Sequence, residues 1–301
     1  MTVAITGGTG FVGQAVLDRA SGQGRPVRAL TRREQPDRKG VNWVRGDLSS
    51  IDALIELVQG AEAVIHIAGV VNAPDAAGFY AGNAAGTEAV VAAARDAGVK
   101  RFVHVSSLAA REPKLSLYGE SKMLAEQFVQ GSGLDSTIVR PPAVYGPRDT
   151  EILELFKAAR WGFVPMPPAG RTSIIHVDDL ARLLLTLAGV PRTDAGIYEP
   201  DDGQPGGWAH GQLARAIGAA MGKRVWAPHV PRPVLMGAAR LDRLFRGKSA
   251  KLTPDRASYM AHPDWTSAPA LAVPEELWSA QVPTEQGLAD TARWYRQHGW
   301  L

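Results

Sequence analysis

The chain has 301 residues and a formal net charge of +3; 45% of its residues are hydrophobic, 21% are charged, and cysteine is absent. The absence of cysteine excludes disulfides, thiolate nucleophiles and thiolate metal sites, and the histidines show no ligand spacing, so we expect no metal. The charged residues form no Lys/Arg stripe of the kind that a nucleic-acid groove requires, so no nucleic-acid partner is expected.

Short β-branched runs alternate with longer helical patterns over the first half of the chain. Most of the runs are apolar on both faces, as the strands of a parallel sheet covered by helices must be. Strands are expected at Val3–Thr6, Val27–Thr31, Trp43–Val44, Ala63–Ile67, Arg101–Val105 and Thr137–Arg140, and helices at Phe11–Ala20, Ile51–Gln59, Ala84–Ala97 and Leu117–Val129. This alternation predicts an α/β fold with a doubly wound parallel sheet of the Rossmann type.

The pattern is less regular beyond about residue 146. Trp161–Gly170 is expected to be a proline-rich connection, and Ser173–Gly189 a strand followed by a helix with Asp178 or Asp179 at its N-cap. Further helices are expected near Gly207–Met221 and Gly287–His298, separated by segments that contain prolines.

These elements suggest a dinucleotide-binding domain over residues 1–165, to which 173–190 return, and a smaller substrate-binding lobe made mainly of 166–301. The first expected strand begins almost at Met1, which leaves no room for a signal peptide, and no apolar run reaches the ~18 residues needed to cross a bilayer. We therefore expect a cytoplasmic protein with no membrane partner.

The sequence TGGTGFVG follows the first expected strand and opens the first expected helix. Gly7 permits a tight turn, Gly10 lets the backbone approach a pyrophosphate, and Gly13 allows close helix–strand packing. The N–H groups at the helix N-terminus favour the phosphates, so the loop predicts a dinucleotide site rather than a purely structural turn. The residues expected at the cofactor are Gly7, Thr9, Gly10, Phe11, Val12 and Gly13.

The end of the second expected strand bears on the choice of dinucleotide. NAD sites usually carry an acidic residue there, whereas this chain has Arg32 and Arg33, which can pair with a 2′-phosphate. NADP is therefore favoured, although Glu34 lies close enough to keep NAD open. Asp47 and Leu48, after the third strand, are expected at the adenine edge; the alternative for Asp47 is a turn carboxylate before the next helix.

Tyr118 and Lys122 lie four residues apart in YGESK and therefore share a helical face. A lysine one turn away is expected to lower the pKa of the phenol, so that Tyr118 can act as a general acid or base. A serine at the end of the preceding strand, Ser107 rather than Ser106, is expected to polarise the substrate oxygen. The alternatives are a half-buried helix tyrosine and a solvated surface lysine.

Together these stretches resemble the extended short-chain dehydrogenase/reductases, which include the NAD(P)-dependent epimerase/dehydratases. Other matching segments are VIHIAG, NAAGT, RFVHVSS, RPPAVYGP and IHVDDLA. The resemblance implies that Ala68 and Gly69 line the adenosine side and that Asn83 supports a helix kink and a proton relay. It also places Ser106, Pro141 and Ala143 at the cofactor, with Pro142 beside them, and suggests a homodimer through paired helices.

Two positions depart from the pattern of the nucleotide-sugar enzymes in this family. Ala143 stands where they commonly have an asparagine that binds the substrate diphosphate, and Thr172 stands where they have an arginine, with Arg171 displaced by one residue. We therefore predict an NADP- or NAD-dependent oxidoreductase acting on a small-molecule carbonyl or secondary alcohol. The alternatives are a nucleotide-sugar epimerase or dehydratase that holds NAD tightly and, less favoured, a non-enzymatic nucleotide-binding module.

Overall fold

The computed structural model describes residues 1–191, 196–247, 250 and 252–301. It divides into two compact units. The first contains residues 1–141, 180–199 and 271–278, and the second contains residues 142–179, 200–270 and 279–301. The domain limits expected from the sequence stay a prediction.

A seven-stranded sheet, parallel throughout, organises the first unit, with strand order β10-β6-β5-β4-β1-β2-β3. This is the order of a doubly wound fold, because the chain starts at β1 and moves outward in both directions. The strands are β1 (Val3–Thr6), β2 (Val27–Thr31), β3 (Val41–Arg45), β4 (Ala63–His66), β5 (Arg101–Val105), β6 (Ser136–Val139) and β10 (Ile197–Tyr198). The Rossmann-type sheet predicted from the sequence is confirmed.

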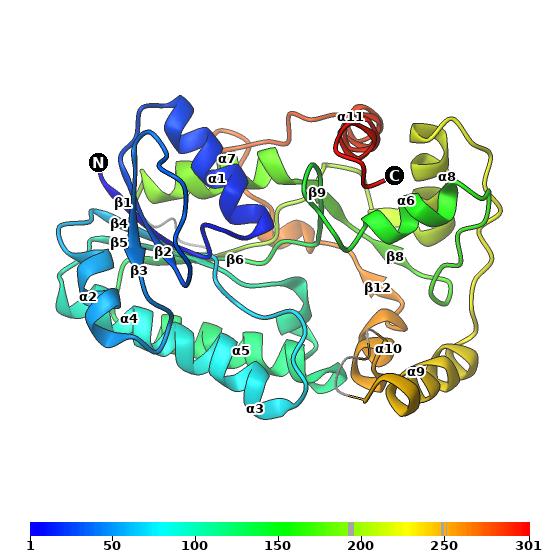
Figure 1. Cartoon of the computed structure of the whole chain (residues 1–301), viewed down its shortest axis with the longest axis horizontal. Coiled ribbons are helices and arrows are strands. Elements are labelled where there is room, and N and C mark those ends of the chain that lie inside the picture. The colour runs from blue at the N-terminus through cyan, green and yellow to red at the C-terminus, as the bar shows by residue number, and fades with distance from the viewer. Residues whose placement is uncertain (192–195, 248–249, 251) are drawn as a thin grey trace. The chain divides into compact units, whose positions relative to one another are not determined.

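Helices cover both faces of this sheet (Figure 1). On one face lie α2 (Ile51–Val58), α4 (Gly86–Asp96) and α5 (Leu117–Gln130); on the other lie α1 (Phe11–Gly22) and the part of α7 (Val177–Ala188) that belongs to this unit. Apolar side chains of α2 and α4, such as Leu57 and Val90, pack on strand residues in one buried cluster. Because every strand residue of β1, β4 and β5 is buried, the apolar runs of the sequence are accounted for by this layering.

Short helical turns connect the carboxyl ends of β4 and β5 to the longer helices. After β4 come α3 (Ala76–Phe79) and a π-helical segment (Tyr80–Ala85) that runs directly into α4. After β5 come two 3₁₀ turns, Leu108–Arg111 and Pro113–Leu115, which lead into α5. The catalytic motifs of the sequence therefore lie at the carboxyl edge of the sheet, where ligands of doubly wound folds bind.

The second unit combines small sheets with helices. Its strands are β7 (Ala143–Tyr145), β8 (Arg171–Thr172), β9 (Ile174–His176), β11 (Trp208–Ala209) and β12 (Asp264–Trp265), arranged as a β11-β8-β12 sheet and a β7-β9 pair. Its helices include α6 (Leu153–Ala159), α8 (His210–Ala220), α9 (Arg232–Arg246), α10 (Pro254–Met260) and α11 (Thr284–Gln297). Phe156, Ile217, Leu288 and Tyr295 share one core, whereas α9 and α10 share a smaller one.

The start of α7 differs from the expected one. The helix begins at Val177, directly after β9, so Asp178 and Asp179 lie in its first turn and neither is the N-cap. The carboxylate of Asp179 instead accepts hydrogen bonds from the backbone N–H groups of Gln281 and Val282 at 2.9–3.0 Å. Its acidic character in the first turn still suits the positive end of the helix dipole.

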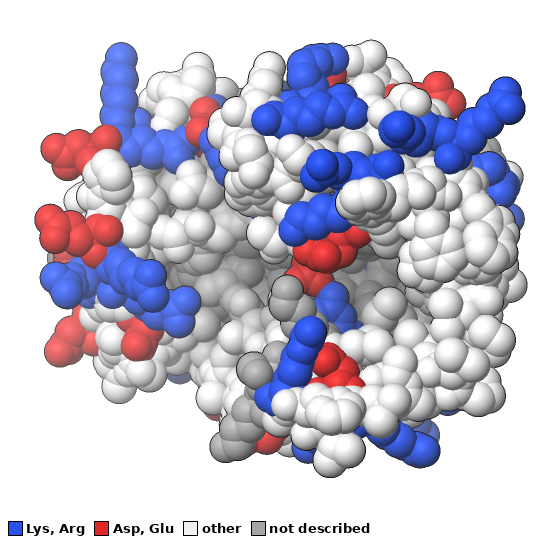
Figure 2. All heavy atoms as spheres, turned by 45° about the vertical axis from the view of Figure 1, so that its right-hand side comes forward, with Lys and Arg blue, Asp and Glu red and all other residues white. Residues whose placement is uncertain are grey.

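Basic and acidic side chains lie among uncharged ones on the face shown in Figure 2. Among the described residues, none of the helices is both long enough and apolar enough to span a membrane.

Candidate active site

The glycine turn has the geometry that its sequence predicts. Gly7 has φ +74°, and a Cβ there would lie 2.7 Å from the backbone nitrogen of Ala68. A Cβ on Gly13 would lie 2.0 Å from the carbonyl oxygen of Gly7, so α1 can approach the turn only without a side chain at this position. Gly10, at the N-cap of α1, brings no side chain to the helix terminus, which leaves the backbone N–H groups of that end available to a phosphate.

The other residues expected around this turn lie at its rim. Thr9 is exposed, and Phe11 and Val12 form the first turn of α1 and are partly exposed. The N–H of Ala68 donates to the Thr6 hydroxyl at 3.2 Å, which ties the end of β4 to the end of β1. Leu48 packs against Gly86 in α4, where a Cβ would meet it at 2.6 Å.

Arg32 and Arg33 follow β2 and are exposed. Thr31 holds this strand end: its hydroxyl donates to the Arg33 carbonyl at 2.6 Å, while both guanidinium groups extend outward without an ion pair to any described residue. The carboxylate of Asp47 accepts hydrogen bonds from the hydroxyls of Ser49 and Ser50 and from the Ser49 N–H. These bonds lower the pKa of Asp47, and the bond from the Ser49 hydroxyl has the largest effect. These contacts are those of the turn carboxylate that was the alternative for Asp47.

Tyr118 and Lys122 lie on α5. The N-cap of this helix is Ser116, whose hydroxyl accepts a hydrogen bond from the Gly119 N–H at 3.0 Å. The Tyr118 hydroxyl is hydrogen-bonded to the Ser107 hydroxyl. Ser107 also accepts from the Ala109 N–H at 3.2 Å, so a backbone turn orients it. The structure thus brings the phenol and the serine together.

The expected lowering of the Tyr118 pKa is wrong in this structure. Burial raises the pKa of Tyr118, and the Ser107 hydrogen bond opposes that rise. The Lys122 ammonium donates one of its three N–H groups to the carbonyl oxygen of Val105, at 2.8 Å. Burial lowers the pKa of Lys122 to about 8, and the nearby Glu126 carboxylate works in the opposite direction.

Glu126 lies one turn beyond Lys122 on α5 and was not predicted from the sequence. Its buried carboxylate accepts two hydrogen bonds from Arg140, Nε–Oε1 at 2.9 Å and Nη2–Oε2 at 2.6 Å, and a third from the Ser106 hydroxyl. Ser106 is therefore committed to this ion pair, whereas Ser107 is the serine beside Tyr118. The i, i+4 spacing from Lys122 is the sequence signal that could have indicated Glu126.

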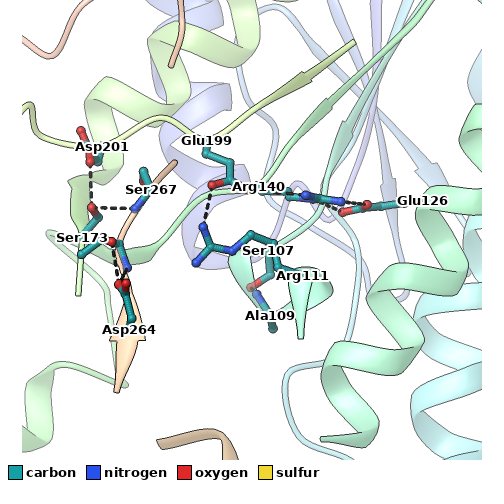
Figure 3. Close-up of polar contacts among 11 residues, drawn as sticks. Ser107, Ala109, Arg111, Glu126, Arg140, Ser173, Glu199, Asp201, Asp264 and Ser267 are labelled. Atoms are coloured by element: carbon teal, nitrogen blue, oxygen red, sulfur yellow. Dashed lines mark hydrogen bonds and ion pairs between the residues drawn. The ribbon is translucent and has the colours of Figure 1, made fainter. Parts of the chain in front are cut away.

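The ion pair extends into a four-membered chain of charges (Figure 3). Arg140 lies between Glu126 and Glu199, with its Nη1 3.4 Å from Glu199 Oε1. Arg111, from the turn after Ser107, reaches the other Glu199 oxygen at 3.0 Å. A bidentate, buried pair of this kind holds both partners in one geometry. The Glu126 carboxylate, one turn from Lys122 on α5, is therefore held in a fixed position.

Asn83 lies in the π-helical segment and is buried. Its side-chain oxygen accepts from the Val70 N–H at 2.8 Å, and its Nδ2 donates to the Val70 carbonyl at 3.0 Å and to the Ser121 hydroxyl at 2.9 Å. A Cβ on Gly69 would lie 2.7 Å from that side-chain oxygen and 3.8 Å from the Lys122 ammonium. The Asn83 side chain thus holds the strand end at Gly69 close to Lys122.

His66 connects these parts through a second buried network. Its Nδ1 lies 2.6 Å from the Thr6 hydroxyl and its Nε2 lies 2.9 Å from the Thr87 hydroxyl. Because the Thr87 hydroxyl donates to the Asn83 carbonyl at 2.6 Å, it accepts from His66 Nε2, and Nδ1 accepts from Thr6. Burial, followed by the Lys122 charge, lowers the pKa of His66 to about 3, so the ring is neutral.

Pro141 and Ala143 lie in different units. The Pro141 carbonyl accepts from the Leu108 N–H at 3.2 Å and so packs beside Ser107. Ala143 begins β7 in the second unit and is exposed. In that unit the Arg171 guanidinium donates to the carbonyls of Gly206 and Gly207, which is a structural use of the displaced arginine.

Four tryptophans in the last third of the chain have different environments. Trp265 and Trp278 are buried, and the Trp208 indole N–H donates to Asp202 at 2.8 Å. Trp226 is 70% exposed and stacks with Phe163 in a tilted arrangement. His176 packs edge-on against Tyr145.

Comparison with known proteins identifies the family. The model of the NAD dependent epimerase/dehydratase family matches residues 3–199. A ceramide reductase of Caulobacter vibrioides (strain NA1000 / CB15N) is 38% identical over 99% of this chain and 96% of that protein. A 4-hydroxy-2-methyl-3-oxo-4-farnesyl-3,4-dihydroquinoline-1-oxide ketoreductase of Stigmatella aurantiaca is 31% identical over 85% of this chain and 90% of that protein.

The fold has a solved counterpart in the Bordetella bronchiseptica enzyme WbmH in complex with NAD⁺, with a TM-score of 0.75 and 21% identity over 99% of each chain. The resemblance drawn from the sequence motifs is thereby confirmed. The chain belongs to the NAD dependent epimerase/dehydratase family and is an NAD(P)-dependent oxidoreductase of the extended short-chain dehydrogenase/reductase type.

Proposed function

We propose that this enzyme reduces a ketone in a lipid-like substrate, with NADPH as the hydride donor. The observation that carries the proposal is the 38% identity to a ceramide reductase over nearly the whole of both chains. The second relative also bears a reductase name, and its named substrate has a 3-oxo group and a farnesyl chain. Both names describe reduction of a molecule with a long hydrocarbon part.

The residues at the carboxyl edge of the sheet fit a dinucleotide. The glycine turn leaves the α1 terminus open to a pyrophosphate, and the exposed Arg32 and Arg33 can pair with a 2′-phosphate. The uncommitted guanidinium groups support NADP over NAD. When bound, the reduced cofactor supplies the hydride that the carbonyl carbon accepts.

In the proposed mechanism the Ser107 hydroxyl donates to the substrate carbonyl oxygen and polarises it. Tyr118 then gives its phenolic proton to that oxygen as negative charge develops there, which completes the alcohol. Lys122, held as an ammonium, stabilises the tyrosinate that remains until solvent returns a proton. Glu126 acts through Lys122, because its carboxylate supports the positive charge of the lysine, and Arg140 holds that carboxylate in place through two hydrogen bonds.

Two residues argue against a substrate with a diphosphate. Ala143 offers no side-chain donor, and Thr172 uses its hydroxyl to donate to the Ser173 carbonyl at 2.9 Å. The guanidinium of the neighbouring Arg171 is held by two backbone carbonyls. A nucleotide-sugar epimerase or dehydratase is therefore the weaker candidate.

NADPH consumption tests the proposal. The purified enzyme is given an N-acylated 3-keto sphingoid base, a short-chain ketone and UDP-glucose, each with NADPH or NADH. We expect turnover of the lipid ketone with NADPH, and loss of about 10³-fold or more in kcat for Tyr118→Phe. Tyr80→Phe, at a tyrosine that is 48% exposed, is the matched control and should keep full activity. Turnover of UDP-glucose with co-purified NAD, and none of the lipid ketone, would refute the proposal.

A further inference from the structure

Helix α9 (Arg232–Arg246) carries an apolar stripe that faces away from the protein. Val234, Leu241 and Phe245 are spaced seven and four residues apart, which places them on one side of the helix, and Leu244 is their neighbour. All four side chains are largely exposed: Val234 at 59%, Leu241 at 56%, Leu244 at 76% and Phe245 at 82%. Isolated exposed apolar residues are common, but four on one side of a single helix form a surface.

The stripe is not the side by which α9 packs. Leu235 and Ala239, one turn apart, are buried against Ala257 of α10 in a small cluster of their own. The Asp242 carboxylate accepts from the Leu252 N–H at 2.9 Å, so that side of the helix is also turned toward the protein. The helix therefore uses one side for its own fold and presents a second apolar side to the exterior.

The charges beside the stripe are positive. Arg240 and Arg243 are exposed and follow Leu244 around the helix, on one side of the stripe. Arg246 is also exposed, but its guanidinium forms an ion pair with Asp242, the acidic residue of the helix, at 3.3 Å. An outward apolar stripe flanked by arginines is the pattern of a helix that lies in the interface of an anionic membrane.

Helix α2 provides a contrast within the same molecule. Ile51 and Ile55 are also exposed, at 70% and 54%, and lie one turn apart. Their helix carries Asp52 and Glu56 and no basic residue, so its charge opposes an anionic surface. Both helices thus expose apolar side chains, but α9 is the one of the two whose positive charge is complementary to anionic lipid.

We propose that α9 docks this enzyme on the surface of a bilayer that contains anionic lipids, with the stripe entering the headgroup region and Arg240 and Arg243 pairing with lipid phosphates. The expectation of no membrane partner depended on the lack of a spanning segment, and a helix lying in the interface needs none. The inference goes beyond the proposed reaction and does not depend on it, because docking requires neither cofactor nor ketone.

Vesicle co-sedimentation of the full chain tests the docking. The probes are phosphatidylcholine vesicles and phosphatidylcholine vesicles with about 30 mol% phosphatidylglycerol, at low and at physiological salt. We expect binding to the anionic vesicles that is at least about tenfold stronger than to the neutral ones and that weakens with salt. The double variant Leu244→Ser/Phe245→Ser should bind at least about tenfold more weakly.

Two further variants separate the contributions. Arg240→Gln/Arg243→Gln should lose about tenfold on anionic vesicles while binding neutral vesicles like the wild type. Ile51→Ser/Ile55→Ser, which removes the equivalent exposed pair from α2, should bind within about twofold of the wild type. All these positions are exposed, so thermal unfolding should change little.

The proposal is overturned if the wild-type enzyme does not bind anionic vesicles, or if the serine variant of α9 binds them as well as the wild type does. It is equally overturned if the stripe mediates self-association, seen as a concentration-dependent oligomer by light scattering that Leu244→Ser/Phe245→Ser abolishes, without vesicle binding. NADPH-dependent turnover of a water-soluble ketone, measured in parallel, keeps failure of docking distinct from failure of the proposed reaction.

Discussion

Glu126→Gln removes one negative charge from beside Lys122 while preserving the size of the side chain. Burial lowers the pKa of Lys122 to about 8, and Glu126 is the group that opposes this lowering. In the variant the lysine loses that support while Arg140 keeps its positive charge, so the pKa of Lys122 falls further. Since the proposed mechanism needs the ammonium, the alkaline limit of the activity profile moves to lower pH.

The size of the shift follows from the geometry. A neighbouring opposite charge moves a pKa by about 1–3 units, and the charge of Glu126 is already shared with Arg140 and Ser106, so the lower end of about 1 unit applies. One unit corresponds to about 1.4 kcal/mol. At pH 8 the charged fraction of Lys122 then falls from about one half to about one tenth, a loss of about fivefold, whereas at pH 6.5 the loss is about 1.3-fold.

The assay is kcat/KM for NADPH-dependent ketone reduction between about pH 6 and 9.5, a range centred near the pKa of the lysine. The pKa values of Tyr118 and of the two histidines that interact with Lys122 are shifted away from this range. Burial raises the pKa of Tyr118 above its ordinary value of 10.0, and burial lowers those of His66, to about 3, and of His104, well below 6.5. A shift of the alkaline limit therefore reports on Lys122.

The control is Glu120→Gln, an exposed carboxylate on the same helix, which should leave the profile unchanged. Glu126→Gln is expected to destabilise the fold by about 3 kcal/mol, because Arg140 loses its bidentate partner, but Glu199 remains 3.4 Å from that guanidinium. The pH at which kcat/KM falls is compared within each variant's own profile, so a uniform loss of active protein does not change that pH. A folded Glu126→Gln enzyme whose alkaline limit coincides with that of the wild type would show that the carboxylate does not support the lysine.

Three further outcomes are expected. Ser107→Ala should lower kcat by about 10²-fold, because it removes the donor to the substrate carbonyl, whereas Ser106→Ala should lower kcat by less than about tenfold. Steady-state kinetics compares the two variants, and equal losses of kcat would contradict the assignment of Ser107 as the donor. Arg32→Ala/Arg33→Ala should weaken NADPH binding by about 10- to 100-fold and leave NADH binding nearly unchanged, as fluorescence titration can measure. Gly13→Ala places a Cβ 2.0 Å from a carbonyl oxygen, so thermal shift should show a lower Tm and no stabilisation by NADPH.

The sheet could be predicted from the sequence because its central strands are buried on both faces. β1, β2 and β5 have the expected limits, and all but one of their residues are buried. Helices α9 and α10 were missed, because each has a proline in its first turn and the prolines were interpreted as interruptions. Proline is favoured at that position, where its missing N–H would have no helical partner, so it indicates a start as well as a break.

The site was predictable where one segment carries the chemistry and unpredictable where distant segments meet. The spacing of Tyr118 and Lys122 is contained within one helix, and so is that of Lys122 and Glu126. The partner of Glu126 is Arg140, at the end of β6, and that pairing exists only because the sheet places this strand end beside α5. For the same reason the direction of the Tyr118 pKa shift could not be obtained from spacing, since burial of the phenol raises this pKa and burial depends on how other segments pack around α5.

Helix α5 arranges its functional groups in order of burial. Tyr118 is partly exposed and has a hydroxyl partner, Lys122 is 4% exposed and bonds a backbone carbonyl, and Glu126 is 3% exposed and bonds a guanidinium. A buried lysine with no carboxylate nearby would lose its proton near neutral pH, and one in direct contact with a carboxylate would have its charge neutralised. By dividing the carboxylate between Arg140 and Ser106, the fold leaves Lys122 charged up to about pH 8.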